Sequence, residues 1–156
     1  MTEHFQVYTD GSCIGNNVKA ARSAGGWAAI ILSKEHSEIQ MSGGSSDTTN
    51  NVMEMVAVIK ALEFLRNFKD CTVEVLTDSM YVIKGCTEWK YGWMARNWRK
   101  TDGSPVLNKE LWCALFELVV TLNVKFTKVK GHSGNKYNDM CDSLACAQSK
   151  RFSEKN

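Results

Sequence analysis

Four carboxylates stand in settings where a charge is costly, and they are the residues best suited to chemistry. Asp10 ends the mostly apolar segment 4–10, and Asp78 ends a second apolar segment in a similar Thr-Asp context. Glu54 and Asp142 lie near the starts of two segments with helical periodicity. Neighbouring carboxylates repel one another unless a cation lies between them, and hard cations such as Mg²⁺ prefer oxygen ligands. The four acids therefore predict a metal site, provided that the fold brings them together.

Each acid also has an ordinary structural interpretation. Asp10 precedes Gly11 and suits a turn, whereas Asp78 suits the N-cap of a helix that starts near Ser79. Glu54 and Asp142 suit the favourable interaction of an acid with the N-terminal end of a helix dipole. A single acid of this kind is weak support for a site. Four of them from separate elements favour the metal site over the structural alternatives.

Periodicity predicts the elements that must position these acids. Strands are expected over 4–10 and 25–32, followed by a third through Ile39 and Met41 that ends at the turn signal 43–46. A helix is expected over 50–67, capped by Thr48 or Thr49. Two further strands are predicted over 72–77 and 124–129, and further helices over 79–84, 110–122 and 138–150. Short loops make the first three strands antiparallel, and helical crossovers require parallel pairing later, so an α/β fold with a mixed sheet is predicted.

Composition limits the class of protein. The chain has 156 residues, 44% of them apolar and 23% charged, which predicts one globular domain over 1–152 with a frayed tail at 153–156. A net charge of +2 excludes a strongly basic nucleic-acid wrapper. Six cysteines without a CxxC pair and three scattered histidines disfavour a zinc module and predict reduced thiols. With no membrane-spanning or secretory pattern, we expect a cytoplasmic protein without membrane contact, and a monomer.

Five motifs together resemble type 1 ribonuclease H over residues 5 to 148. They are Tyr8-Thr-Asp-Gly-Ser-Cys13, Thr48-Thr-Asn-Asn-Val-Met-Glu54, Leu76-Thr-Asp-Ser-Met-Tyr-Val82, Val129-Lys-Gly-His-Ser-Gly134 and Asn138-Asp-Met-Cys-Asp142. The resemblance implies a five-stranded mixed sheet in the order 3-2-1-4-5, flanked by helices and bearing a basic helical protrusion. It also implies endonucleolytic hydrolysis of the RNA strand of RNA/DNA hybrids, giving 5′-phosphate and 3′-hydroxyl ends.

The resemblance assigns roles to individual residues. It makes Asp10, Glu54, Asp78 and Asp142 the ligands of two Mg²⁺ ions, with Mn²⁺ as an alternative, and His132 a mobile histidine that assists proton transfer or product departure. For the hybrid it places Asn16, Asn50, Asn51 and the backbone around Cys13 at the minor groove, near the RNA 2′-hydroxyls. It places Thr49 and Asn108 at a phosphate pocket that senses the DNA strand, and Trp89 and Trp93 at the substrate-facing positions of the protrusion that grips that strand. A structural alternative stays open for these polar residues as helix caps or turn formers.

Charge and tryptophan gather in one segment. Residues 84–109 carry a net charge of +4, which leaves −2 for the rest of the chain. Interleaved cations and tryptophans suit contacts with phosphates and with sugar or base faces, although Trp98 and Trp112 are expected in the core. Several residues depart from the family pattern in ways that remove positive charge or hydrogen-bonding groups, so we expect weaker or more salt-sensitive substrate binding: Asn17, Asp47, Val52, Met80, Met94 and Ala95. A non-catalytic hybrid-binding module, or another nuclease of the same fold, remains the alternative function.

Overall fold

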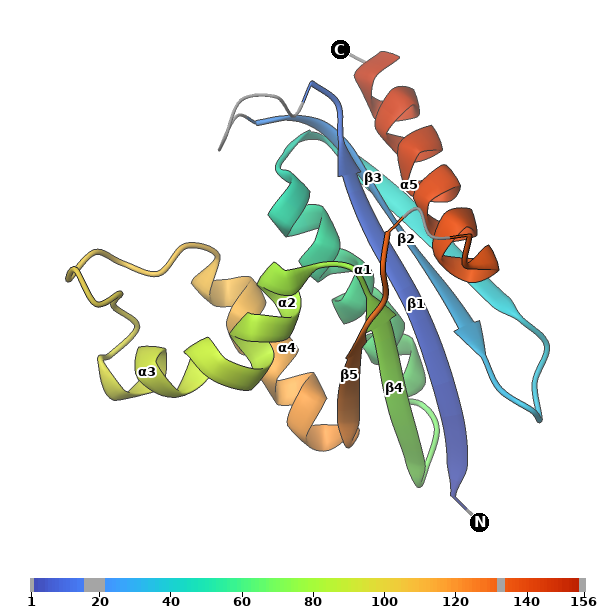
Figure 1. Cartoon of the computed structure of the whole chain (residues 1–156), viewed down its shortest axis with the longest axis horizontal. Coiled ribbons are helices and arrows are strands. Elements are labelled where there is room, and N and C mark those ends of the chain that lie inside the picture. Colours follow the sequence, from blue (N-terminus) through green and yellow to red (C-terminus); the bar gives the residue numbers. More distant parts are fainter. Residues whose placement is uncertain (1, 16–21, 132–133, 155–156) are drawn as a thin grey trace.

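A five-stranded mixed sheet forms the centre of the protein in the computed structural model, which describes residues 2–15, 22–131 and 134–154. The strands are β1 (Glu3–Cys13), β2 (Ser23–Leu32), β3 (Ile39–Thr48), β4 (Cys71–Thr77) and β5 (Val124–Lys128). Their order is β3-β2-β1-β4-β5, with β1, β2 and β3 antiparallel and both β4 and β5 parallel to their neighbours (Figure 1). The predicted fold class and strand order are confirmed.

Alternating side chains divide the core between the two faces of the sheet. On β2, Ala29 and Ile31 pack under α1 (Asn50–Leu65), in a core to which α4 (Lys109–Thr121) also contributes, whereas Ala28 and Ile30 pack under α5 (Lys136–Glu154). A strand buried on both faces reads as a continuous apolar run, as β2 does. Helices therefore cover both sides of the sheet (Figure 1). Ser153 and Glu154 belong to the last turn of α5.

The third strand does not end where its glycines suggested. β3 continues through residues 43–46 to Thr48, and Gly43 and Gly44 pair with Trp27 and Gly26 of β2. A Cβ on Gly43 would lie 2.8 Å from the indole nitrogen of Trp27, and one on Gly44 would lie 2.7 Å from the ring of Phe152. The two glycines thus make room for large rings that cover the strand. The prediction of a turn was wrong because this close packing is non-local.

A helical insertion projects from the body between β4 and α4 (Figure 1). It runs through α2 (Met80–Lys84), a π-helical turn (Gly85–Trp89) and α3 (Lys90–Ala95). The prediction of a helix starting near Ser79 is confirmed, because the Ser79 side chain accepts a hydrogen bond from the backbone N–H of Val82 and caps α2. The insertion contacts the core at Gly85, where a Cβ would lie 2.1 Å from the Trp112 ring.

All six cysteines lie among the described residues, and none of them forms a disulfide there. Over the same described ranges, none of the helices has the length and apolar character needed to cross a membrane.

Candidate active site

Parallel pairing of β1 with β4 places two of the four acids side by side. The last paired residues are Tyr8 and Leu76, and Asp10 and Asp78 each follow two residues later. The Thr-Asp dipeptide therefore recurs at the same level on two adjacent strands. Asp10 is only 6% exposed, and its Oδ1 accepts a hydrogen bond of 2.9 Å from the backbone N–H of Gly11.

Gly11 lets the third acid reach these strands. A Cβ on Gly11 would lie 2.5 Å from the backbone nitrogen of Glu54 and 2.9 Å from its Oε1, so α1 crosses β1 in direct backbone contact. Thr49 begins this helix, and its hydroxyl accepts a hydrogen bond of 3.2 Å from the N–H of Val52. Next to Asp10, Gly11 suits a turn, and its local sequence does not predict this second role, because no local pattern records the approach of a distant helix.

The carboxylates of Asp10, Glu54 and Asp78 offer oxygens that all lie within 4.8 Å of one another. Burial, followed by the charge of Asp78, raises the pKa of Asp10 from 3.8 to about 7. Burial and the charges of Asp10 and Asp78 also raise the pKa of Glu54 well above its ordinary value. Without a compensating cation, this arrangement of anions is electrostatically unfavourable.

The donor set fits a divalent cation. Glu54 Oε1 is buried and has no hydrogen-bond partner among the described residues. A buried carboxylate oxygen without a partner is costly, and a hard cation is the ligand that satisfies several such oxygens together. Three converging carboxylates with an unpartnered oxygen therefore have the chemistry of a magnesium or manganese site rather than of a salt bridge.

Asp142, the fourth predicted ligand, is not one of the three acids whose oxygens lie within 4.8 Å of one another, but its charge affects them. It lies in the second turn of α5, and its charge contributes to the raised pKa of Asp10. Two contacts place α5 against the sheet: the Cys141 thiol donates to the carbonyl of Tyr8 at 3.3 Å, and a Cβ on Gly26 would lie 2.2 Å from the carbonyl of Ala145. The structure thus brings three predicted ligands together and sets Asp142 beside them.

The predicted histidine, His132, lies outside the described residues. The residue before it, Gly131, lies against Asp78, because a Cβ there would be 2.9 Å from Asp78 Oδ2. The segment that carries His132 therefore begins against the carboxylate cluster.

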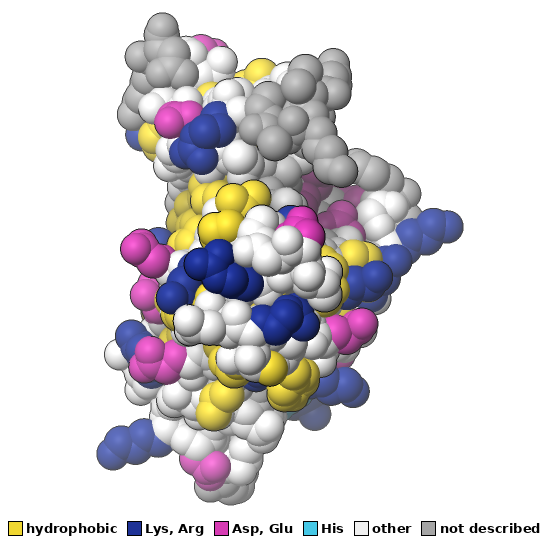
Figure 2. Space-filling model, turned by 90° about the vertical axis from the view of Figure 1, so that its left-hand side faces the viewer, with side chains coloured by type: hydrophobic (Ala, Val, Ile, Leu, Met, Phe, Trp, Pro, Cys, Tyr) yellow, Lys and Arg dark blue, Asp and Glu magenta, His cyan; other side chains and the backbone are white. Residues whose placement is uncertain are grey.

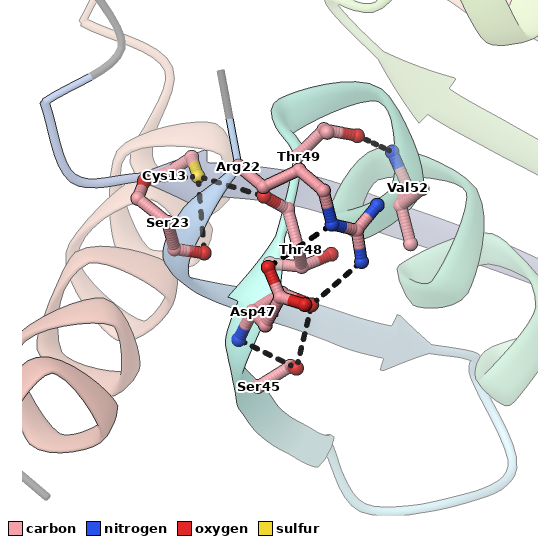
Figure 3. Close-up of polar contacts among 8 residues, drawn as sticks. All are labelled: Cys13, Arg22, Ser23, Ser45, Asp47, Thr48, Thr49 and Val52. Atoms are coloured by element: carbon pink, nitrogen blue, oxygen red, sulfur yellow. Dashed lines mark hydrogen bonds and ion pairs between the residues drawn. The ribbon is translucent and has the colours of Figure 1, made fainter. Parts of the chain in front are cut away.

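The predicted minor-groove residues that the structure describes, Cys13, Asn50 and Asn51, lie at the end of the sheet where β1, β2 and β3 meet α1. Cys13 is buried, and its thiol lies 3.0 Å from Ser23 Oγ and 3.6 Å from the carbonyl of Thr48 (Figure 3). Asn51 is exposed, whereas Asn50 is half-buried and its Oδ1 has no hydrogen-bond partner in the described part of the chain. Asn16 lies outside that part.

The tryptophans of the insertion divide into an exposed and a buried group. Trp89 is 38% exposed, but Trp93 is only 9% exposed and packs 5.3 Å, centroid to centroid, from the fully buried Trp112. The prediction that Trp112 lies in the core is confirmed, and Trp98 is partly buried against that core. Trp89 and Trp93 still share one feature. Both line a cavity of about 430 Å³ whose other walls include Arg96 and Lys100.

The side of the molecule toward which α3 projects mixes Lys and Arg with apolar side chains (Figure 2). Asn108, expected at a phosphate pocket, begins α4 with a left-handed φ of 62° and donates a hydrogen bond of 3.1 Å to the Tyr81 hydroxyl. Its side chain therefore links the insertion to α4. Sequence reasoning did not anticipate this link, because the partner is 27 residues away.

Comparison with known proteins agrees with this geometry. The sequence profile of the RNase H family matches residues 2–150. The ribonuclease H of Neorickettsia sennetsu is 42% identical over 150 residues, covering 96% of this chain and 95% of the relative. That of Thiobacillus denitrificans is 47% identical over 139 residues, covering 89% and 88% respectively. The crystal structure of LC9-RNase H1, described as a type 1 RNase H with the type 2 active-site motif, superimposes with a TM-score of 0.85 at 26% identity, covering 97% of this chain and 74% of that one. The chain therefore belongs to the ribonuclease H family.

Proposed function

We propose that this protein is a divalent-metal-dependent endonuclease that hydrolyses the RNA strand of RNA/DNA hybrids and leaves 5′-phosphate and 3′-hydroxyl ends. The observation that carries the proposal is the cluster of Asp10, Glu54 and Asp78, with oxygens within 4.8 Å and one of them buried without a partner among the described residues. Membership in the family supports the choice of substrate. A non-catalytic binding module is disfavoured, because such a module would gain nothing from this costly arrangement of anions.

Asp10, Glu54 and Asp78 would hold Mg²⁺, or Mn²⁺, and Asp142 would complete a site for two ions. When bound, the cations supply activation of the attacking water and stabilisation of the leaving 3′ oxygen. The protein keeps the oxygens converged through the β1–β4 pairing and the contact at Gly11, so little reorganisation is needed when substrate binds. His132, next to Gly131, would move a proton during attack or help the product to leave.

The substrate surface is proposed to extend to both sides of the acids. On one side, Asn50 and Asn51 at the start of α1, with Thr49, Asn16 and the backbone at Cys13, would contact sugars and phosphates in the minor groove. The 2′-hydroxyl is the group that distinguishes RNA from DNA there. On the other side, the cations and Trp89 of the insertion, with Trp93 and Asn108 supporting them, would contact the DNA strand.

The proposal also covers the domain organisation, the oligomeric state and the cellular compartment of the protein. Residues 1–152 would form one catalytic domain that works as a monomer. Six free thiols suit a reducing compartment such as the cytoplasm.

Cleavage of labelled duplexes tests the activity. The expected result is internal cleavage of the RNA strand in an RNA/DNA hybrid, only in the presence of Mg²⁺ or Mn²⁺, with RNA/RNA and DNA/DNA duplexes left intact. Asp10→Asn should abolish cleavage, whereas Asp139→Asn, which changes an exposed acid one turn before Asp142, should not. Hybrid binding without cleavage by the unaltered protein would favour the binding-module alternative, and cleavage by Asp10→Asn would contradict the assigned site.

A further inference from the structure

An ion pair lies at the end of the sheet where the minor-groove residues were predicted. Arg22 Nε contacts Asp47 Oδ1 at 3.0 Å, and Arg22 Nη2 donates to the backbone carbonyl of Asp47 at 3.0 Å. Figure 3 shows the Arg22 side chain reaching from the start of β2 to the end of β3, beside Thr49 and the first turn of α1. Two bonds to one residue hold the guanidinium in a defined orientation.

The register of the strands sets the distance between this pair and the carboxylates. Asp10 pairs with Ala28, and Ser23 pairs with Thr48, so Arg22 lies next to the N-cap of the helix that carries Glu54. About six residues of strand separate Arg22 from the level of Asp10, which is about 20 Å at roughly 3.3 Å per residue. A duplex that ran along β2 from the carboxylates would reach Arg22 within roughly six base pairs at about 3.4 Å each.

Stability of the fold does not explain the pair. The side chains of Arg22 and Asp47 are 57% and 71% exposed, and exposed ion pairs contribute little to folding because solvent screens them. An uncovered carboxylate at this edge would, however, repel the phosphates of any nucleic acid that passes it. Arg22 cancels that charge, and its planar guanidinium, which carries five N–H donors, keeps donors beyond those used on Asp47.

We propose that Arg22 is a phosphate-binding residue for the hybrid and that Asp47 is the positioning residue that orients its guanidinium. The inference rests on the proposed function for the identity of the duplex. It also gives Asp47 a role beyond the loss of positive charge at this position. The cation at this edge comes instead from the segment before β2, and the acid holds it there.

Direct binding separates this inference from the proposed activity. The dissociation constant of a labelled hybrid is measured in EDTA by fluorescence anisotropy at several salt concentrations, for the unaltered protein, Arg22→Gln, Asp47→Asn and the double variant. Lys60→Gln is the matched control, because Lys60 is an exposed cation in an ion pair with Glu63 on α1. Melting temperatures of all variants are compared, and each should stay close to that of the unaltered protein.

Loss of one charge-assisted phosphate contact predicts a roughly tenfold weaker affinity for Arg22→Gln at about 100 mM salt. The slope of log affinity against log salt should fall in magnitude by about 0.8. Lys60→Gln should change neither quantity, and the double variant should remain several-fold weaker than the unaltered protein.

Two results would overturn the inference. In the first, Arg22→Gln leaves the affinity and the salt slope unchanged, as Lys60→Gln should. In the second, the double variant regains the full affinity and salt slope, which would mean that Arg22 only neutralises the charge of Asp47. If the protein binds hybrid in a way that depends on Arg22 but does not cleave it, the proposed function is contradicted and this inference is supported. A protein that neither binds nor cleaves hybrid would refute both.

Discussion

Replacing Asp10 by asparagine should make the metal-free protein more stable at pH 8 while removing its activity. The amide side chain would keep the size of the carboxylate and an oxygen that accepts from the N–H of Gly11. It cannot carry the negative charge that burial and the neighbouring acids disfavour. A residue assigned to the metal site would therefore be a source of instability whenever the metal is absent.

The magnitude follows from the pKa of Asp10, which is raised from 3.8 to about 7 by burial and by the charge of Asp78. Because the folded pKa lies above the unfolded one, the stability that this group contributes is fully present below pH 3.8 and is lost as the pH rises through about 7. At about 1.36 kcal/mol per pH unit, ionisation costs up to about 4 kcal/mol above pH 7. Asp10 is only 6% exposed, so solvent screening reduces this value little. Allowing for the cost of burying the amide, we expect a gain of about 2 to 4 kcal/mol at pH 8.

Urea denaturation in EDTA at pH values from 4 to 8 measures the difference between the two proteins. The free energy of unfolding that Asp10→Asn gains over the unaltered protein is expected to be near zero at pH 4 and to reach its full value between pH 7 and 8. Millimolar Mg²⁺ should reduce the difference in free energy of unfolding between the two proteins, because it stabilises only the unaltered protein, which binds it. Asp139→Asn is the control and should be neutral or slightly destabilising at every pH, since it removes an exposed acid from the first turn of α5. A gain of equal size at pH 4 and pH 8, or none at pH 8, would refute the electrostatic reasoning.

Other substitutions test the backbone contacts. Gly11→Ala should cost at least about 2 kcal/mol in urea denaturation and lower kcat sharply, because its Cβ would lie 2.5 Å from the backbone of Glu54; full activity would show that α1 can shift without moving the site. Asn97→Gly should raise stability by roughly 0.5 to 1 kcal/mol in thermal denaturation, because Asn97 has a φ of 56°, and Asn97→Ala should lower it; equal effects of the two variants would contradict this. Thr49→Ala should lose about 1 kcal/mol of stability through its N-cap, and Thr49→Ser should retain it.

Much of this protein was predictable from the sequence because its local patterns are strong. Helical periodicity from Val52 to Leu65 located α1, and the apolar runs located the strands with errors of a few residues at their ends. The two Thr-Asp dipeptides marked equivalent positions before their strands were known to be neighbours. Local pattern could do this because the alternation of side chains records which residues face a core.

Only the tertiary structure decided how distant segments meet. Gly43 and Gly44 indicated a turn, but they continue β3 under the rings of Trp27 and Phe152. Trp93, predicted to face the substrate, packs on Trp112 and is largely buried, although it also lines the cavity beside Trp89. In both cases the residue type fits two environments, and the choice depends on a partner outside the local sequence.

The same distinction applies to the site. Sequence named the four acids, but the convergence of three of them depends on the β1–β4 register and on the absence of a Cβ at Gly11, and the position of Asp142 depends on how α5 packs on Gly26. In the sequence, Asp47 is an unfavourable charge at the binding face, but in the structure it forms an ion pair with Arg22, 25 residues earlier. Charge and polarity belong to single residues, whereas their energetic consequences depend on distance and burial, which exist only in the folded chain.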